Sequence, residues 1–180
     1  MLNTRFSDLT PLFYAVFDRI IPAANKYMAT LFNTSASDIL MVTGIFRHNW
    51  QVTGVAGDIL EQYLARITAR TAGTAVTLRT HDSVEVIPAG VVADTNSTVV
   101  TEGHTIRRLW ARNEEVSFSK KTADTDDLVG FNGGDVITIW KQTPSYVGII
   151  LRQNEGISIR NVTASAVGSV SYVMEFTQVY

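Results

Sequence analysis

Three histidines, His48, His81 and His104, are the side chains in this 180-residue sequence best suited to metal binding or proton transfer. Their positions show neither an i, i+4 spacing nor an HxH spacing. The sequence therefore predicts no local metal motif, and a three-histidine site assembled by the fold is the open alternative.

Two motifs hold the residue types of a hydrolytic triad and of a calcium loop, but the spacing of their residues argues against both functions. His81-Asp82-Ser83 holds the residue types of a hydrolytic triad, but consecutive residues cannot adopt triad geometry and no GxSxG elbow is present. Asp124, Asp126 and Asp127 could begin a calcium loop, but the glycine and the glutamate of an EF-hand are missing from their places. We predict a polar loop at each motif, and no catalytic, cofactor-binding or metal-ligating residue or cofactor.

Glycines and aromatic residues give further candidates for binding. Asn132-Gly133-Gly134 is the strongest hairpin signal in the chain, and it opens a strand, so it offers no helix N-terminus to phosphate. Arg107-Arg108 beside Trp110 could stack on a base, but in a near-neutral chain we expect an exposed strand face. Trp50, Trp110 and Trp140 could form a sugar-stacking platform, although tryptophans of a β-sandwich more often lie in the core or an interface.

Composition excludes several classes of function. A net charge of −2 argues against duplex nucleic acid as a partner, and the absence of cysteine removes disulfides and thiolate chemistry. No apolar run is long enough to span a bilayer, and the first residues do not resemble a signal peptide, so we expect a soluble protein made in the cytoplasm. Asn33, Asn96 and Asn161 match the N-glycosylation pattern, which matters only in a secretory pathway.

The C-terminal stretch carries the clearest structural pattern. It has three apolar runs, Tyr146–Leu151, Gly156–Val162 and Gly168–Tyr180, and Asn154-Glu155-Gly156 forms the first break with residues that tolerate positive φ. In the last run Val170, Tyr172, Met174 and Phe176 recur at every second position, which is typical of a strand with one face on a core. We predict an antiparallel meander that ends on this long strand.

Earlier segments also favour strands. Lys26–Phe32 and Ile39–Trp50 flank a polar turn and predict a hairpin with a loose loop. Asp58–Ala69 is different, because Asp58 and Glu61 form a pair like a capping box and its apolar residues have helical spacing. Local rules therefore favour a helix there. Further short strands are expected at Ala75–Arg79, Thr98–Thr101, Thr105–Ala111, Glu114–Lys121, Leu128–Phe131 and Val136–Lys141. Turns about every 8–12 residues are typical of a sandwich or a jelly roll.

Residues 1–25 differ from the rest. Thr10 and Pro11 could cap a helix whose apolar residues continue to Ile20, before Pro22 ends the pattern. The same residues, rich in Phe, Tyr, Val and Ile, also suit an extended arm or a strand. The sequence supports a helix and an extended arm equally. It also supports equally the burial of these apolar side chains on the chain's own domain and their burial on a partner.

Several stretches together resemble jelly-roll structural proteins of tailed-phage virions. These stretches are ATLFNTSASDILMV (Ala29–Val42), VTGVAGDILEQYLARITARTAGTAVT (Val52–Thr77), HDSVEVIPAGVV (His81–Val92) and LRQNEGISIRNVTASAVGSVSYVMEFTQV (Leu151–Val179). The resemblance covers most of residues 26–180 and implies that Asp58–Ala69 is a strand. It implies a virion context but carries over no catalytic residue.

The sequence and this resemblance together give one expectation. We expect an all-β protein, an antiparallel β-sandwich of jelly-roll type over residues 26–180 with a short N-terminal extension or arm over residues 1–25. The expected role is a non-enzymatic capsid decoration protein, or another accessory head or neck protein, located in the virion. Its expected partners are other virion proteins, foremost the major capsid protein, and copies of itself in a trimer or dimer, with no nucleic acid and no membrane. The alternative is a carbohydrate-binding or receptor-recognition module of a phage fibre or spike.

Overall fold

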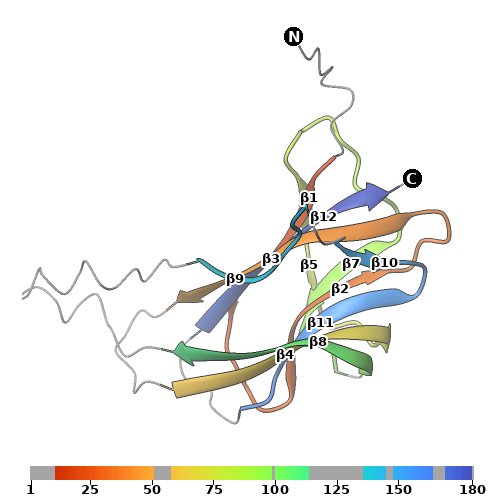
Figure 1. Cartoon of the computed structure of the whole chain (residues 1–180). Coiled ribbons are helices and arrows are strands. Elements are labelled where there is room, and N and C mark those ends of the chain that lie inside the picture. Colours follow the sequence, from red (N-terminus) through yellow and green to blue (C-terminus); the bar gives the residue numbers. More distant parts are fainter. Residues whose placement is uncertain are drawn as a thin grey trace, which may run out of the picture.

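The computed structural model describes residues 11–50, 58–98, 100–113, 136–144, 148–163 and 169–179. Throughout these ranges the regular structure is β, without a helix, as the composition and turn spacing predict. The strands form two antiparallel sheets that pack face to face (Figure 1). The all-β, sandwich-like class expected from the sequence is confirmed.

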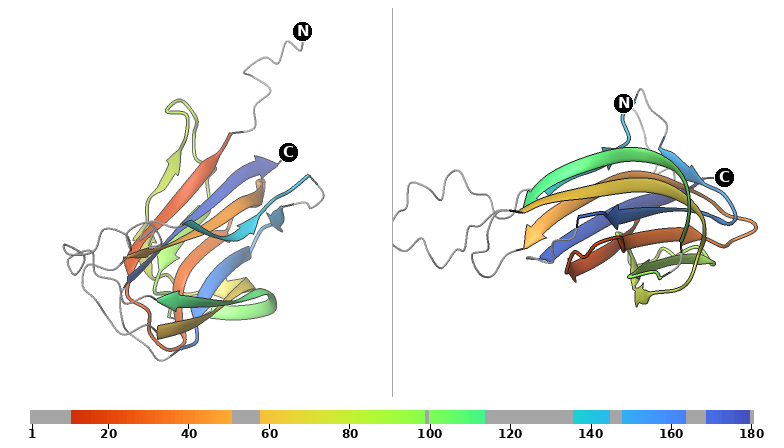
Figure 2. Two further views of the ribbon diagram at one scale, coloured as in Figure 1. Left: turned by 60° about the vertical axis from the view of Figure 1, so that its left-hand side comes forward. Right: turned by 90° about the horizontal axis from the view of Figure 1, so that it is seen from below.

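The strands follow one another along the chain as β1 (Phe13–Ile20), β2 (Lys26–Asn33), β3 (Ile39–Trp50), β4 (Asp58–Arg70), β5 (Thr74–Val76), β6 (Leu78–Thr80), β7 (Val91–Thr95), β8 (Val100–Asn113), β9 (Val136–Lys141), β10 (Ile149–Leu151), β11 (Glu155–Asn161) and β12 (Ser169–Val179). Sheet A has the order β10-β3-β12-β1-β6, and β9 also pairs with β3. Sheet B has the order β5-β7-β2-β11-β4-β8 (Figure 2).

Strand β12 forms the centre of sheet A, and its alternating pattern is confirmed. The side chains of Val170, Tyr172, Met174 and Phe176 are fully buried between the sheets. Phe176 packs against Phe13 of β1, with ring centroids 5.6 Å apart. Burying large side chains from alternate positions of both sheets is what holds the two layers together.

Strand β1 lies between β12 and β6, so the helical alternative for this segment is wrong. Phe13, Ala15 and Phe17 are buried, while Val16 is 37% exposed on the other face of the sheet. This alternation has a period of 2, which a sheet satisfies and a helix does not. The sequence left open whether residues 1–25 are buried on the chain's own domain or on a partner. From Phe13 onward the structure shows burial on the chain's own core. Residues 1–10 lie outside the described part.

Strand β4 corrects the local prediction of a helix at Asp58–Ala69, and the strand implied by the family resemblance is confirmed. β4 pairs with β11 on one side and β8 on the other. Leu60, Gln62 and Leu64 are buried, whereas Glu61 and Tyr63 are partly exposed on the opposite face. Two neighbouring strands and a buried face outweigh the local preference of the capping pair.

Two predicted strand pairings are wrong because successive strands alternate between the sheets. β2 lies in sheet B and β3 in sheet A, so they do not form the expected hairpin. At the C-terminus β10, β11 and β12 lie in sheets A, B and A, so the expected meander is not formed either. The turn itself is confirmed, since Asn154 has a φ of 58°. Turn residues mark where a strand ends, but they do not determine whether the next strand pairs with it or crosses to the other sheet.

The remaining predicted strands have mixed outcomes. The expected strand at Ala75–Arg79 is two short strands, β5 in sheet B and β6 in sheet A. The two strands expected within Thr98–Ala111 are one long strand, β8, at the edge of sheet B. Val136–Lys141 is confirmed as β9. Glu114–Lys121, Leu128–Phe131 and the Asn132-Gly133-Gly134 hairpin lie outside the described residues, as do Asp124, Asp126 and Asp127.

Candidate functional site

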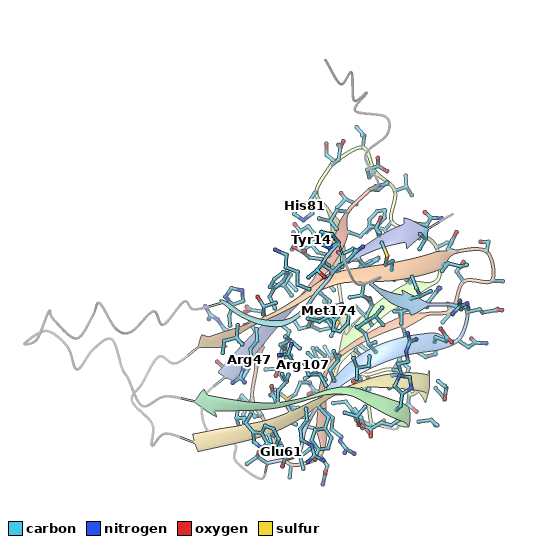
Figure 3. All side chains as sticks on the ribbon, in the orientation of Figure 1. Tyr14, Arg47, Glu61, His81, Arg107 and Met174 are labelled. Carbon is cyan, nitrogen blue, oxygen red and sulfur yellow. The ribbon has the colours of Figure 1, made fainter. Side chains whose placement is uncertain are left out.

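The three histidines lie on separate elements. His48 is on β3 in sheet A, and His104 is on β8 in sheet B. His81 follows β6 and packs against Tyr14 in a tilted arrangement, with ring centroids 4.8 Å apart (Figure 3). In the ranges that the structure describes, no three His, Cys, Asp or Glu side chains gather as metal ligands would. The three-histidine site is therefore not formed.

The His81-Asp82-Ser83 tripeptide shapes a loop. The His81 N–H donates to the Leu12 carbonyl at 3.2 Å, and the Asp82 carboxylate accepts the Val84 N–H at 3.1 Å. These contacts hold the loop beside β1 and orient none of its side chains as a nucleophile would require.

Two of the three glycosylation-type asparagines are structural. Asn33 is fully buried, and its Nδ2 donates to the carbonyls of Asp38 at 2.7 Å and Leu151 at 3.1 Å. Asn161 is also fully buried, and its Nδ2 donates to the carbonyl of Ala23 at 2.8 Å. Neither amide is available for modification in the folded protein.

A buried polar network crosses the space between the sheets. Arg47 of β3 is 1% exposed, and its Nη1 donates to Oε1 of Gln62 on β4 at 3.4 Å. Nε2 of Gln62 in turn donates to the Tyr172 hydroxyl at 2.6 Å. Among the residues that the structure describes, Nε and Nη2 of Arg47 have no hydrogen-bond partner. Burial lowers the pKa of Arg47 and raises the pKa of Tyr172 to about 12. No sequence pattern points to this network, because it joins strands distant in the chain.

A second polar group lies on the outer face of sheet B, where β4 bends across β7. Arg70, at the end of β4, forms an ion pair with Asp94 of β7. Asp94 also accepts a hydrogen bond from Ser97, and Thr30 and Ser158 share one at 2.9 Å. Three irregularities in the β4–β8 register accompany the strong curvature of these strands in Figure 2. Apart from Arg70, the side chains of this group are buried, so their contacts stabilise the fold.

Further along the same outer face, arginine and tyrosine alternate across four strands. Arg108 of β8, Tyr63 of β4, Arg160 of β11 and Tyr27 of β2 occupy one row of the register. The guanidinium carbons of Arg108 and Arg160 lie 4.7 Å and 5.4 Å from the centroid of the Tyr63 ring, which is cation–π geometry. Glu102 of β8 pairs with Arg160 at 3.3 Å.

The next row contains Glu61 and Trp110, directly opposite each other on β4 and β8. Oε1 of Glu61 accepts the Tyr63 hydroxyl at 2.9 Å and lies 3.7 Å from Nε of Arg108. The hydrogen bond to Glu61 is the main reason that the pKa of Tyr63 is raised. Trp110 is 64% exposed, and its ring centroid lies 5.9 Å from the Arg108 guanidinium carbon. We call Trp110, Arg108, Glu61 and Tyr63 the Trp110 surface.

The structure separates residues that the sequence places together. Nη1 of Arg107 donates to the Ile139 carbonyl of β9 at 2.6 Å and so links sheet B to sheet A, while Arg108 faces outward. Figure 3 shows Arg47 and Arg107 toward the space between the sheets and Glu61 beyond β4. Trp110 and Trp140 lie in different sheets, so the three-tryptophan platform is not assembled.

The outer face of sheet A is apolar at its centre. Val16 of β1, Val173 of β12 and Phe46 of β3 occupy one row of the register. Val16 is 37% exposed, and Val173 and Phe46 are partly exposed. The Phe46 ring lies over Gly44, since a Cβ built there would be 2.6 Å from Cε2 of Phe46. Ile39, at the start of β3, is 39% exposed. We call Val16, Val173 and Phe46 the sheet A row.

The geometry thus defines an all-β protein of two packed antiparallel sheets, with polar and aromatic side chains on the outer face of sheet B and one apolar row on the outer face of sheet A. No family model, curated protein or solved structure matches the chain. The described residues include no helix of the length and hydropathy needed to cross a bilayer.

Proposed function

We propose that this protein is a non-enzymatic structural component of a phage virion, built on a jelly roll. In this role it is a capsid decoration protein, or another accessory head or neck protein, that binds neighbouring virion subunits. Its partners are the major capsid protein and further copies of itself, in a trimer or, as second choice, a dimer. It is made in the host cytoplasm and resides in the virion.

The pairing of the longer strands supports the jelly-roll part of the proposal. β1 pairs with β12, β2 with β11, β3 with β9 and β10, and β4 with β8. These are the pairs of one long antiparallel hairpin, in which each strand of the first half meets its counterpart in the second half. Folding such a hairpin over on itself gives the two sheets of a jelly roll. The short strands β5, β6 and β7 are then additions between β4 and β8.

The sheet A row is the observation that carries the binding role. Three apolar side chains on adjacent strands stay in contact with water on a face whose other side is the core. Covering them with a partner would remove that apolar area from water, at about 25 cal/mol per Å². A rigid sheet also holds such a surface in place without ordering costs on binding. The resemblance of residues 26–180 to tailed-phage structural proteins supplies the virion context for the partner.

The test is to place a charge on this face and to measure assembly. Val16→Lys and Val173→Lys should leave the protein folded but weaken its self-association in analytical ultracentrifugation and its attachment to expanded capsids that lack it. The matched control is Val86→Lys, since Val86 is 82% exposed in a loop and should tolerate the change. Each interface should bury roughly 1,000 Å². A wild-type protein that stays monomeric at high concentration and does not attach to such capsids would refute the proposal.

A further inference from the structure

The Trp110 indole is a large aromatic surface that the fold leaves in water. It is 64% exposed on β8, the edge strand of sheet B, and its cross-strand neighbour is the carboxylate residue Glu61. A tryptophan in this position contributes little to the core, whereas its flat face is suited to stacking against a ring with an apolar side.

The polar groups around this indole are held in place before any ligand arrives. The Tyr63 ring lies between the guanidinium groups of Arg108 and Arg160, and its hydroxyl is fixed on Glu61. The Glu61 backbone is fixed as well, because its N–H donates to Oγ1 of Thr163 at 2.6 Å and its carbonyl accepts the Val162 N–H at 2.8 Å. A preorganised donor and acceptor pair binds with a smaller entropy cost.

In the two described rows of this face, each arginine has a carboxylate partner. Arg108 is paired with Glu61 at 3.7 Å and Arg160 with Glu102 at 3.3 Å. Arginines paired with carboxylates, as these two are, attract a phosphate polymer less than unpaired arginines do. This face does offer guanidinium N–H donors next to a carboxylate acceptor, and both described contacts of the Glu61 carboxylate use Oε1, which leaves Oε2 as an acceptor.

We propose that the Trp110 surface is a binding site for a neutral saccharide. The C–H face of a sugar ring stacks on the Trp110 indole. Two adjacent hydroxyls of the sugar then bridge the ion pair, one donating to the Glu61 carboxylate and the other accepting from the Arg108 guanidinium. Hydroxyls can do both because each is a donor and an acceptor. This site lies on sheet B, away from the sheet A row, so it is independent of the assembly role.

The experiment is a titration of the intact protein with a panel of neutral sugars. The panel contains glucose, galactose, mannose and N-acetylglucosamine and short oligomers of each, and binding is followed by calorimetry and by indole fluorescence. At least one sugar class should give a saturable signal. Trp110→Ala should weaken its affinity about tenfold or more, and Trp110→Phe should weaken it less because a smaller aromatic face remains. Ile137→Ala, at a 40% exposed residue of sheet A, is the control and should bind as the wild type does.

Three results would overturn the proposal. One is the absence of a saturable response to every member of the panel. Another is a Trp110→Ala variant that is folded and binds as tightly as the wild type. The third concerns a sulfated polysaccharide titrated beside the panel: if it binds more tightly than every neutral sugar and its binding falls steeply with salt, the surface binds polyanions instead. Trp110→Ala should attach to capsids as the wild type does. A failure of the saccharide proposal can therefore be told apart from a failure of the proposed virion role.

Discussion

Arg47 and Tyr172 lie directly opposite each other on β3 and β12, yet their side chains are joined through Gln62 of the other sheet. Arg47 is 1% exposed, and within the described part of the chain its guanidinium group has one hydrogen bond, at 3.4 Å. The pKa of an arginine is too high for the guanidinium group to lose its proton in a folded protein, so the positive charge of Arg47 stays in the core. Part of the stabilisation from apolar burial is therefore offset by this side chain.

Replacing Arg47 by methionine should stabilise the protein. Arg47→Met keeps much of the side-chain volume and removes a buried charge that no carboxylate of the described residues pairs with, so we expect the free energy of unfolding to rise by about 1–3 kcal/mol. Urea unfolding measures this. Arg79→Met, at an exposed residue of β6, is the control and should change stability little. A clear loss of stability in Arg47→Met would mean that the contact with Gln62 outweighs the cost of burying the charge.

Tyr172 should make the protein less stable in alkali. Burial raises its pKa in the folded state from 10 to about 12, so between these pH values the unfolded chain loses a proton that the folded chain retains. The contribution is fully present below pH 10 and falls by about 1.4 kcal/mol per pH unit above it. Urea unfolding at pH values of about 9, 10 and 11 should show this slope, and Tyr172→Phe should show less of it. An identical slope in Tyr172→Phe would contradict the assignment.

Much of the strand content could be predicted from the sequence, because period-2 alternation is a local property. The alternation in β12 is visible in the sequence, and so are the turn residues at Asn154. β4 was not predictable from local rules, because its pairing with β11 and β8 decides its conformation. Turn residues likewise do not encode the crossing between sheets, which produced the wrong pairing of β2 with β3.

The candidate surfaces required the register of distant strands. Arg108, Tyr63 and Arg160 are far apart in the sequence, and only the pairing of β8, β4 and β11 brings them into one row. The sequence did single out Trp110 and the adjacent arginines as binding candidates. It could not show that Arg107 turns toward β9 while Arg108 turns outward, because that depends on which face of β8 is buried.

Gly156 should not tolerate a side chain. It lies on β11 between β2 and β4, and an added Cβ would be 2.6 Å from the Leu31 carbonyl oxygen and 2.6 Å from Cδ2 of Phe32. Gly156→Ala should therefore lower the free energy of unfolding by about 1–3 kcal/mol through overpacking. Gly103→Ala on β8 is the matched control, since its Cβ would come no closer than 3.5 Å to a neighbour. Equal stability of the two variants in thermal unfolding would show that β11 is not packed as described.

Phe17 tests whether β1 completes the core. Its side chain is fully buried and β1 separates β12 from β6, so Phe17→Ala should lower the free energy of unfolding by about 3–5 kcal/mol. Val16→Ala, on the outer face of the same strand, should cost less than about 1 kcal/mol, since much of that side chain is already in water. Removing residues 1–22 should prevent folding, because it deletes the whole of β1. Two results together would contradict this: a truncated protein that stays folded and soluble, and a Phe17→Ala variant as stable as Val16→Ala. They would show that residues 13–20 are an arm that binds a partner.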